Sequence, residues 1–238
     1  MESLNKKTGN IFIAGTDTGV GKTVLSLLLM QFFFAKGYRP FYLKPVQTGC
    51  KDPNDIDSDA RFIYEHVGQL RDKEPGDSVI YCFRNPKAPL FAANDEGKTI
   101  DLSVIERAVA QKKMSHSPLI IEAAGGVLVP VAGCTMVADM IKLTKCIPLI
   151  AARAGLGTIN HTLLTIEALQ RREIQPLGVV FIDPGKEETT SEMIDENRSA
   201  IEGASGVKVV GVIGKIQDFS QPDQACYDPL VTLFGKIL

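Results

Sequence analysis

The feature of this sequence that most restricts its fold is a glycine-rich segment between two apolar runs. Residues 15–23 read GTDTGVGKT; an apolar run at 11–14 precedes them and a longer one at 24–35 follows. A strand, a glycine-rich loop ending in Gly-Lys-Thr and a helix, in that order, form a phosphate site, because the glycines let backbone N–H groups approach phosphate oxygens. The helix N-terminus adds further unpaired donors. The segment therefore predicts a nucleotide phosphate loop.

Two side chains in this segment carry its chemistry. Lys22 supplies a positive charge at the β- and γ-phosphates, and the hydroxyl of Thr23 is a ligand for Mg²⁺. Five residues rather than four separate Gly15 from Gly21, so the segment is a variant of the usual motif. A glycine-rich turn with Lys22 in solvent is the alternative, and the position of the helix start disfavours it. The residues expected to contact the nucleotide here are Gly19, Val20, Gly21, Lys22, Thr23 and Val24.

Short apolar runs alternate with longer helical patterns along the chain. We expect strands at 11–14, 40–43, 119–121, 147–151, 177–181 and 207–212, and helices at 22–36, 59–67, 102–113, 136–143, 158–171 and 188–201. This alternation predicts α/β architecture: a doubly wound, mainly parallel sheet with helices on both faces. The helix at 22–36 is apolar on almost every face, so a further layer, such as a second subunit, should cover it. No repeat or linker divides the sequence, and we expect a single phosphate-loop domain over residues 1–238.

The composition is that of an ordinary globular protein, with 45% hydrophobic and 23% charged residues. Its 26 basic and 28 acidic residues leave a formal charge of −2, which gives no general attraction for nucleic acid or anionic membranes. Any bound anion must therefore be held by a local site. The longest apolar stretch, at 24–35, is shorter than the roughly 20 residues that span a bilayer, so we expect no membrane or targeting segment. The five cysteines lack zinc-site spacing, and we interpret them as reduced thiols of a cytoplasmic protein.

Polar residues follow two further expected strands, in the region where open α/β sheets bind ligands. Lys44 comes after the strand at 40–43. A lysine there is usually only a solvated charge, but its place beside the phosphate loop favours a role in the site. Glu122 ends the strand at 119–121, where a carboxylate can hold Mg²⁺ directly or through water. An exposed side chain at a strand end is the alternative.

Two other segments have both an ordinary and a functional interpretation. Asp59 begins an expected helix, where an aspartate is commonly a cap, although it could also be a metal ligand with Thr23. Asp55 and Asp57 compete for either role, and the residues alone favour the cap. Residues 154–161 read AGLGTINH and open another helix. Glycines before a helix N-terminus suit a carboxylate or phosphate, but a capped turn fits equally well.

Together these segments resemble one known family, the ATP-dependent dethiobiotin synthetases. The matching segments are residues 15–23, 44–46, 58–60, 88–93, 122–126 and 157–161. They follow the order of the family, and the similarity runs from about residue 10 to about residue 181. The resemblance implies a cytosolic homodimer of a doubly wound α/β domain that acts in biotin biosynthesis.

The reaction that the resemblance implies is closure of a ureido ring on 7,8-diaminopelargonate (7,8-diaminononanoate) with CO₂, ATP and Mg²⁺. One amine captures CO₂ as a carbamate, the carbamate oxygen attacks the γ-phosphate, and the second amine displaces phosphate from the carbamic–phosphoric anhydride. Charge builds on the carbamate and on the transferring phosphoryl group. Two lysines and a metal in a preorganised cleft suit this chemistry.

The resemblance also implies roles for individual residues. Lys22 and Lys44 are the catalytic residues, which neutralise the γ-phosphate and the carbamate. Thr23, Asp59 and Glu122 match the Mg²⁺ ligands, and this replaces the cap interpretation of Asp59. The substrate-binding residues are Thr48, in place of a serine, and Gly155 and Asn160, in the turn that receives the substrate carboxylate across the dimer interface. The remaining nucleotide-binding residues are Asp59, Glu122, Ala123, Ala124, Gly125 and Asp183.

The sequence departs from the family at three positions. Ile182 stands where the family has an asparagine that reads the base, Gly214 replaces the proline of an Ile-Pro contact segment, and Leu90 replaces a histidine. A base pocket without such hydrogen bonds should discriminate weakly between nucleotides, so the base preference stays open.

Two alternatives to a synthetase remain. Nucleotide-switch ATPases of the chromosome-partitioning and nitrogenase iron protein kind share the variant loop but act by dimer remodelling. Those proteins carry a lysine early in the loop, where this chain has Thr-Asp-Thr at 16–18. A non-catalytic binding module would not be expected to keep Lys22, Thr23, Lys44 and Glu122.

Overall fold

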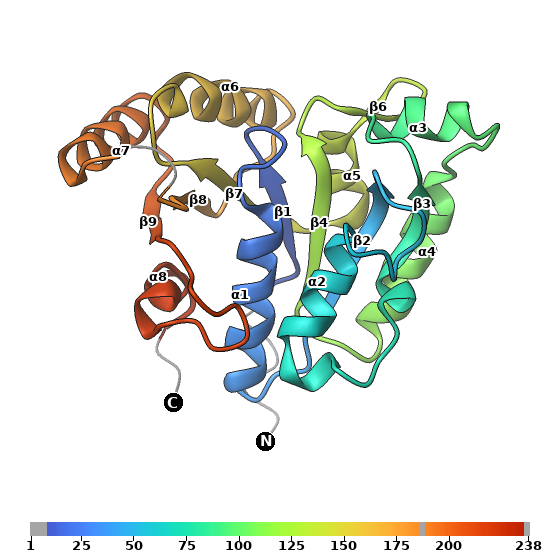
Figure 1. Cartoon of the computed structure of the whole chain (residues 1–238). Helices are drawn as coiled ribbons and strands as arrows, with labels where there is room; N and C mark the ends of the chain where they lie inside the picture. The colour runs from blue at the N-terminus through green and yellow to red at the C-terminus, as the bar shows by residue number, and fades with distance from the viewer. Residues whose placement is uncertain (1–8, 186–188, 236–238) are drawn as a thin grey trace.

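The computed structural model describes residues 9–185 and 189–235 as alternating strands and helices (Figure 1). The strands are β1 (Ile11–Gly15), β2 (Phe41–Thr48), β3 (Val79–Phe83), β4 (Leu119–Gly126), β5 (Pro130–Ala132), β6 (Thr135–Met136), β7 (Ile147–Arg153), β8 (Gly178–Ile182) and β9 (Val209–Ile213). The helices are α1 (Lys22–Ala35), α2 (Asp59–His66), α3 (Pro89–Asp95), α4 (Leu102–Lys113), α5 (Val137–Thr144), α6 (Thr158–Gln170), α7 (Ser191–Ser205) and α8 (Asp228–Phe234). Short 3₁₀ turns lie at Gly68–Leu70, Pro75–Ser78 and Gln224–Tyr227.

Seven of the described strands form one sheet in the order β3-β2-β4-β1-β7-β8-β9. Every neighbouring pair in it is parallel, whereas β5 and β6 form a separate antiparallel pair. The chain winds from β1 to β2 and β3 on one side, returns through β4, and continues to β7 on the other side. The point of reversal therefore lies at β1 and β4, where doubly wound sheets bind ligands. The predicted doubly wound parallel sheet is confirmed.

Side chains of the central strands alternate between two cores on opposite faces of the sheet. Phe12 of β1 belongs to a cluster that includes residues of α4, α5, α6 and α7. Its neighbours Ile11 and Ile13 belong to the other cluster, which includes residues of α1, α2 and α8. Figure 1 shows α1 and α2 in front of the sheet and α5 behind it. The uninterrupted apolar runs of the sequence are thus strands buried on both faces.

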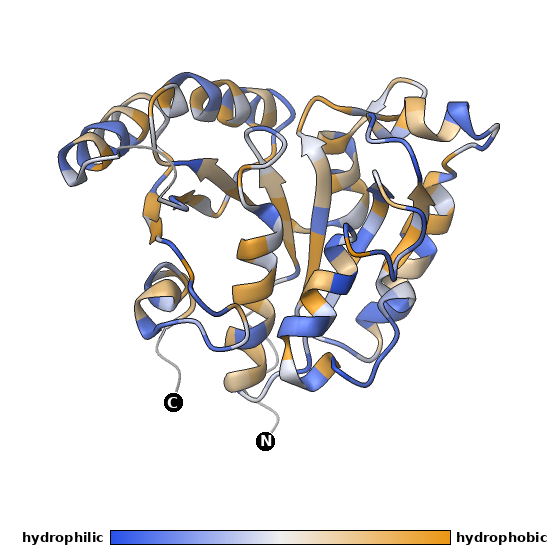
Figure 2. Cartoon of the chain, viewed as in Figure 1, coloured by the Kyte–Doolittle hydropathy of each residue, from blue (hydrophilic) through white to orange (hydrophobic). Residues whose placement is uncertain are grey.

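Helix α1 is largely apolar along its whole length (Figure 2), and the chain's own C-terminal segment covers it. The ring of Phe234 lies 5.1 Å from that of Phe33, measured between centroids. The side chain of Gln31 donates to the carbonyl of Phe219 and accepts from the hydroxyl of Tyr227. The expectation of a further layer was correct, but residues of this chain supply it on this face, and a second subunit is not needed there.

Two strands that carry site residues are longer than expected. Lys44 and Thr48 lie inside β2 and Glu122 lies inside β4, whereas the sequence placed Lys44 after a strand and Glu122 at a strand end. Because β2 and β4 run parallel with Leu43 opposite Ile121, the next residues, Lys44 and Glu122, become neighbours. The extension of the sheet is what brings these two charges together.

Other boundaries differ by a few residues, and some elements were not expected. The sequence did not predict β3, α3, β5, β6 or α8. The expected start of a helix at residue 188 lies outside the described residues, and the described helix α7 begins at Ser191. Within residues 9–185 and 189–235, no helix combines the length and apolar character that crossing a membrane requires.

Candidate active site

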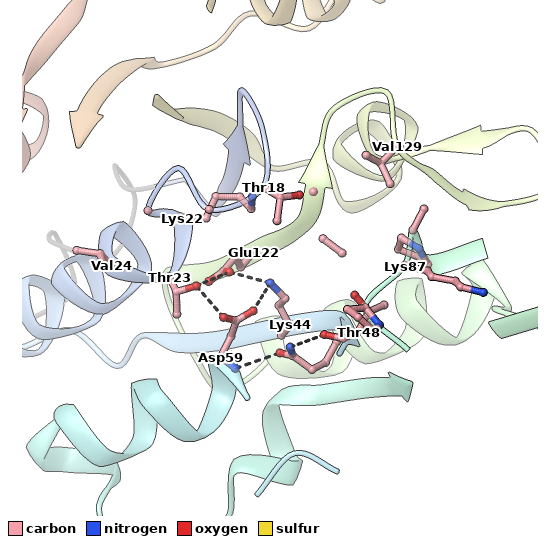
Figure 3. A pocket seen from close by; sticks show the side chains of 18 residues that line it. Thr18, Lys22, Thr23, Val24, Lys44, Thr48, Asp59, Lys87, Glu122 and Val129 are labelled. Atoms are coloured by element: carbon pink, nitrogen blue, oxygen red, sulfur yellow. Dashed lines mark hydrogen bonds and ion pairs between the residues drawn. The ribbon is translucent and has the colours of Figure 1, made fainter. Parts of the chain in front are cut away.

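A cavity of about 570 Å³ opens at the carboxyl ends of β1, β2 and β4 (Figure 3). Its walls come from the phosphate loop, the end of β2, the start of α2 and the end of β4, and Lys87 lies at the side next to α3. Of the residues expected in the site, those that line this cavity are Gly19, Gly21, Lys22, Thr23, Val24, Lys44, Thr48, Asp59, Glu122, Ala124 and Gly125.

Two glycines shape the phosphate loop. Gly21 has a φ of +91° at the start of α1, and a Cβ there would lie 2.7 Å from Cγ2 of Ile182. A Cβ on Gly15 would lie 2.9 Å from Cδ of Lys22, so a glycine at this position lets the lysine stem cross the loop. The ammonium group of Lys22 then donates to the carbonyl oxygen of Asp17 at 2.8 Å. The side chain of Lys22 therefore crosses the loop and is hydrogen-bonded to its backbone.

Lys22 lies in surroundings that favour a bound anion. Its pKa is lowered to about 8, first because burial disfavours the ammonium and then because the charge of Lys44 is close. The N-terminus of α1 adds positive partial charge at the same place. The negative charge of a phosphate group at this loop would offset the repulsion of Lys22 by Lys44 and by the helix N-terminus. The electrostatics of the loop therefore agree with the phosphate-binding motif.

Lys44 bridges two carboxylates in the cavity (Figure 3). Its Nζ lies 2.6 Å from Oδ2 of Asp59 and 2.7 Å from Oε1 of Glu122, and it donates to the carbonyl of Ala123 at 3.2 Å. Lys44 is only 4% exposed and Glu122 only 1%. Burial acts to lower the pKa of Lys44, but the attraction of the two carboxylates is stronger, and the net pKa is raised. Lys44 is therefore a buried ammonium and not a solvated charge.

Asp59 points into the cavity and does not cap α2. The cap is Ser58, whose hydroxyl oxygen accepts from the N–H of Arg61 at 3.4 Å. Asp55 accepts from the backbone N–H of Lys51 in its own loop, and neither Asp55 nor Asp57 lines the cavity. Of the three aspartates that competed in the sequence, the structure brings only Asp59 to the other site residues.

The charge of Asp59 is held in place by its neighbours. Burial acts to raise the pKa of this carboxyl group, but the charge of Lys44 and the hydrogen bonds from Lys44 and Thr23 lower it, and the net pKa is lowered. The backbone N–H of Asp59 donates to Oε1 of Gln47 at 3.2 Å, which fixes the start of α2 against β2. Asp59 is therefore an ionised carboxylate on a rigid support.

The hydroxyl of Thr23 has two carboxylates within reach but only one proton to donate. Its Oγ1 lies 2.9 Å from Oδ1 of Asp59 and 3.0 Å from Oε1 of Glu122. One of these contacts must therefore pair two oxygens with no proton between them. Three oxygens that lie this close together and share a single hydroxyl proton form a suitable site for a hard divalent cation such as Mg²⁺. Among the described residues, no three or more His, Cys, Asp or Glu side chains come together in a way that could hold a metal ion, so a cation here would complete its shell with phosphate or water oxygens.

A second cavity, of about 450 Å³, lies on the other side of the phosphate loop. Val20, Gly155 and Asp183, all expected in the site, line it together with Ile182. Asn160 is exposed on the first turn of α6 and lines neither of these cavities. The structure of one chain thus divides most of the expected residues between the two cavities and leaves Asn160 and the buried Ala123 outside both.

The sequence interpretation missed two residues that touch Glu122. The hydroxyls of Ser26 and Tyr42 lie 2.9 Å and 3.0 Å from Oε2 of Glu122. A signal for both was present: Ser26 follows Lys22 by four residues on a helix, and Tyr42 precedes Lys44 by two on a strand. These spacings place each pair on one face of its element.

Known proteins with similar sequences agree on one family. Residues 9–223 match the model of a family described as an AAA domain. Over 173 residues the chain is 37% identical to an ATP-dependent dethiobiotin synthetase of Hydrogenobaculum sp., covering 72% of this chain and 75% of that protein. Over 209 residues it is 33% identical to an ATP-dependent dethiobiotin synthetase of Methanococcus vannielii, covering 88% of this chain and 95% of that protein. The chain belongs to the dethiobiotin synthetase family. The expected class, a carbon–nitrogen bond-forming enzyme of biotin biosynthesis, is confirmed.

Solved structures with little sequence similarity share the fold of this dethiobiotin synthetase family member. The cell division ATPase MinD of Pyrococcus furiosus superposes with a TM-score of 0.57 at 14% identity, covering 95% of this chain and 97% of that one. Apo McdA of Cyanthece gives a TM-score of 0.56 at 13% identity, covering 95% and 98%. At such identities the likeness shows the phosphate-loop fold alone. The choice between a synthetase and a switch ATPase rests on the sequence relatives.

Proposed function

We propose that this chain is a dethiobiotin synthetase that closes the ureido ring of 7,8-diaminopelargonate with CO₂ and ATP, with Mg²⁺ as cofactor. The observation that carries the proposal is the buried ammonium of Lys44, held between Asp59 and Glu122 in the cavity that also contains the phosphate loop. A cation at the mouth of a phosphate site suits a reaction in which an anionic carbamate attacks a γ-phosphate. Family membership supports the choice of substrate.

The chain's own residues supply most of the machinery for phosphoryl transfer. Backbone N–H groups of residues 19–23 and the ammonium of Lys22 hold the triphosphate at the N-terminus of α1. Lys44 faces the same cavity and neutralises the carbamate oxygen as it attacks. Thr23, Asp59 and Glu122 would hold Mg²⁺, which when bound supplies positive charge to the phosphate oxygens.

The carbamate forms at one amine of the substrate, and its oxygen attacks the γ-phosphate with ADP as the leaving group. The second amine then attacks the carbonyl carbon of this mixed anhydride and expels phosphate. The last step needs a water-poor site, because water would compete with the amine for the anhydride. The cavity offers Thr48 as a hydroxyl for substrate. Strand β4 pairs with both β2 and β1, and this fixes the distance between Lys44 and the phosphate loop. Preorganised charges of this kind act where charge develops in the transition state.

Coupled phosphate release tests the proposed function. We expect the purified chain to release phosphate from ATP only when 7,8-diaminopelargonate and bicarbonate are both present, with one dethiobiotin formed per phosphate. Phosphate can be followed continuously and dethiobiotin by mass spectrometry. Equal hydrolysis without the diamine would favour a switch ATPase, and no hydrolysis with it would favour a binding module.

Weak base selectivity is a second expectation. The second cavity, which we propose takes the nucleoside, has Ile182 where the family has a base-reading asparagine, and Val20 and Val24 also line it. Arg153, Asp183 and Thr189 are the polar side chains of its lining. Without the amide of the asparagine the pocket should discriminate poorly between bases, so kcat/KM for ATP, CTP and GTP should agree within about tenfold. Ile182→Asn should widen the gap in favour of ATP. A preference above about a hundredfold in the unaltered chain would mean that other groups read the base.

We also propose that the enzyme is a cytoplasmic homodimer of a single domain, in which the partner completes the substrate site. Two apolar side chains near Asn160 support this, because Leu156 is 93% exposed and Leu164 on α6 is 55% exposed. Leu164 follows Asn160 by four residues on α6, so the exposed leucine and the unused amide share one face of the helix, which a second copy could cover. The single domain is supported by the two cores, which draw on elements from β1 to α8.

Changing Leu164 to glutamate should separate the subunits. We expect a dimer-to-monomer shift in sedimentation velocity and at least a tenfold rise in KM for the diamine, because Asn160 of one copy would no longer reach the site of the other. Met114, 87% exposed after α4, provides the control, and Met114→Glu should change neither quantity. A monomeric unaltered enzyme with full activity would contradict the interface.

A further inference from the structure

The two carboxylate oxygens of Glu122 have different surroundings. Oε1 faces the cavity, where it accepts from Lys44 at 2.7 Å and lies 3.0 Å from the hydroxyl oxygen of Thr23. Oε2 faces away from these groups and accepts from the hydroxyls of Ser26 at 2.9 Å and Tyr42 at 3.0 Å. One oxygen therefore meets the reactive groups, and the other meets only two neutral donors.

The donors on Oε2 are fixed parts of the core. Tyr42 is 1% exposed and Ser26 is fully buried, one on β2 and one on α1. An ionised carboxylate only accepts hydrogen bonds, so a hydroxyl next to it must donate. The Ser26 hydroxyl has a second acceptor, the carbonyl of Lys22 at 2.9 Å, but a bond to a charged group is the stronger of the two.

The backbone of Tyr42 is also anchored by Ser78, which directly precedes β3. The hydroxyl of Ser78 donates to the carbonyl of Tyr42 at 2.7 Å, and the hydroxyls of Ser78 and Tyr64 lie 2.8 Å apart. Both Ser78 and Tyr64 are buried. Tyr42 is therefore held at its main chain and at its phenol, and it gives Glu122 little freedom to rotate.

We propose that Ser26 and Tyr42 are positioning residues, which hold Oε2 of Glu122 so that Oε1 stays directed at the divalent cation of the site. The inference rests on the proposed function only for the presence of that cation. Removing a group that orients a ligating carboxylate commonly weakens metal binding about 10- to 100-fold, and we expect an effect of this size here. Neither residue touches substrate, and neither is a catalytic residue.

Mn²⁺ binding tests this proposal without any turnover. In the full-length chain with a non-hydrolysable ATP analogue, free Mn²⁺ is measured by electron paramagnetic resonance during titration. Tyr42→Phe and Ser26→Ala should each raise the Mn²⁺ dissociation constant about tenfold or more. In kinetic assays the Mg²⁺ concentration that gives half-maximal rate should rise by a similar factor, while KM for the diamine stays unchanged.

Tyr64→Phe is the matched control. It removes a phenol that is also buried and hydrogen-bonded, but its partner is Ser78 and not Glu122, and the hydroxyl of Ser78 can still donate to the carbonyl of Tyr42. Loss of a structural hydrogen bond would lower the melting temperature of both tyrosine variants, whereas only Tyr42→Phe should weaken Mn²⁺ binding. If Tyr42→Phe does not fold, Ser26→Ala decides alone.

Unchanged Mn²⁺ affinity in both Tyr42→Phe and Ser26→Ala would overturn the proposal, and so would an unaltered chain that binds no Mn²⁺ with nucleotide. A wrong diamine substrate would instead leave the Mn²⁺ titrations as expected and fail only in the coupled phosphate assay. The two failures are therefore distinguishable.

Discussion

Lys44→Gln is expected to lower the rate of dethiobiotin formation about a thousandfold while nucleotide affinity falls less than tenfold. Glutamine fills a similar volume but lacks the charge that faces the carbamate. The phosphate loop and Lys22 are untouched, so the triphosphate keeps its main contacts. Product formation by mass spectrometry and nucleotide binding by calorimetry separate the two effects.

The loss of Lys44 also leaves two buried carboxylates without their shared cation. Breaking such a pair from one side typically costs about 3–5 kcal/mol, so the melting temperature of the variant must be measured alongside its rate. Lys87→Gln serves as the control, because Lys87 lines the same cavity but is about half exposed and pairs with exposed Asp95. Normal turnover in folded Lys44→Gln would remove Lys44 from the mechanism.

The parts of the site that the sequence predicted are those that depend on local chain order. A glycine-rich loop between a strand and a helix brings its own lysine and threonine with it, so Lys22 and Thr23 follow from the motif. Lys44 and Glu122 were expected near the loop because parallel strands end at one edge. Their direct contact was not predictable, since it depends on strand pairing that continues past the last apolar residue of each run.

The parts that the sequence did not predict depend on contacts between distant segments. The side chain of Asp59 was free to enter the site because Ser58 caps α2, and adjacent candidates of this kind cannot be ranked without geometry. The edge strand β3 is a different case, because residues 79–83 read VIYCF, an apolar run that fits a strand, and the sequence interpretation missed it. The cover over α1 comes from residues about 190 positions later in the chain, and no periodicity reports such a contact.

Thr23→Val should lower kcat/KM at a fixed Mg²⁺ concentration by about a hundredfold and raise the Mg²⁺ concentration needed for half-maximal rate. Valine has the shape of threonine without its hydroxyl, so α1 should keep its packing. The variant loses one of three converging oxygens and leaves Asp59 and Glu122 without a shared donor. Rates across a Mg²⁺ titration measure both quantities.

Thr23→Ser separates the role of the hydroxyl from that of the methyl group. Because serine keeps the oxygen, its Mg²⁺ requirement should stay within about threefold of the unaltered enzyme, allowing for the greater rotamer freedom of serine. Lys44 remains charged in both variants. If saturating Mg²⁺ partly restores the rate of Thr23→Val, the defect therefore lies in cation binding and not in the ammonium of Lys44. A Thr23→Val enzyme with a normal Mg²⁺ requirement would show that the hydroxyl of Thr23 does not bind the cation, and that the ammonium of Lys44 is enough to balance Asp59 and Glu122.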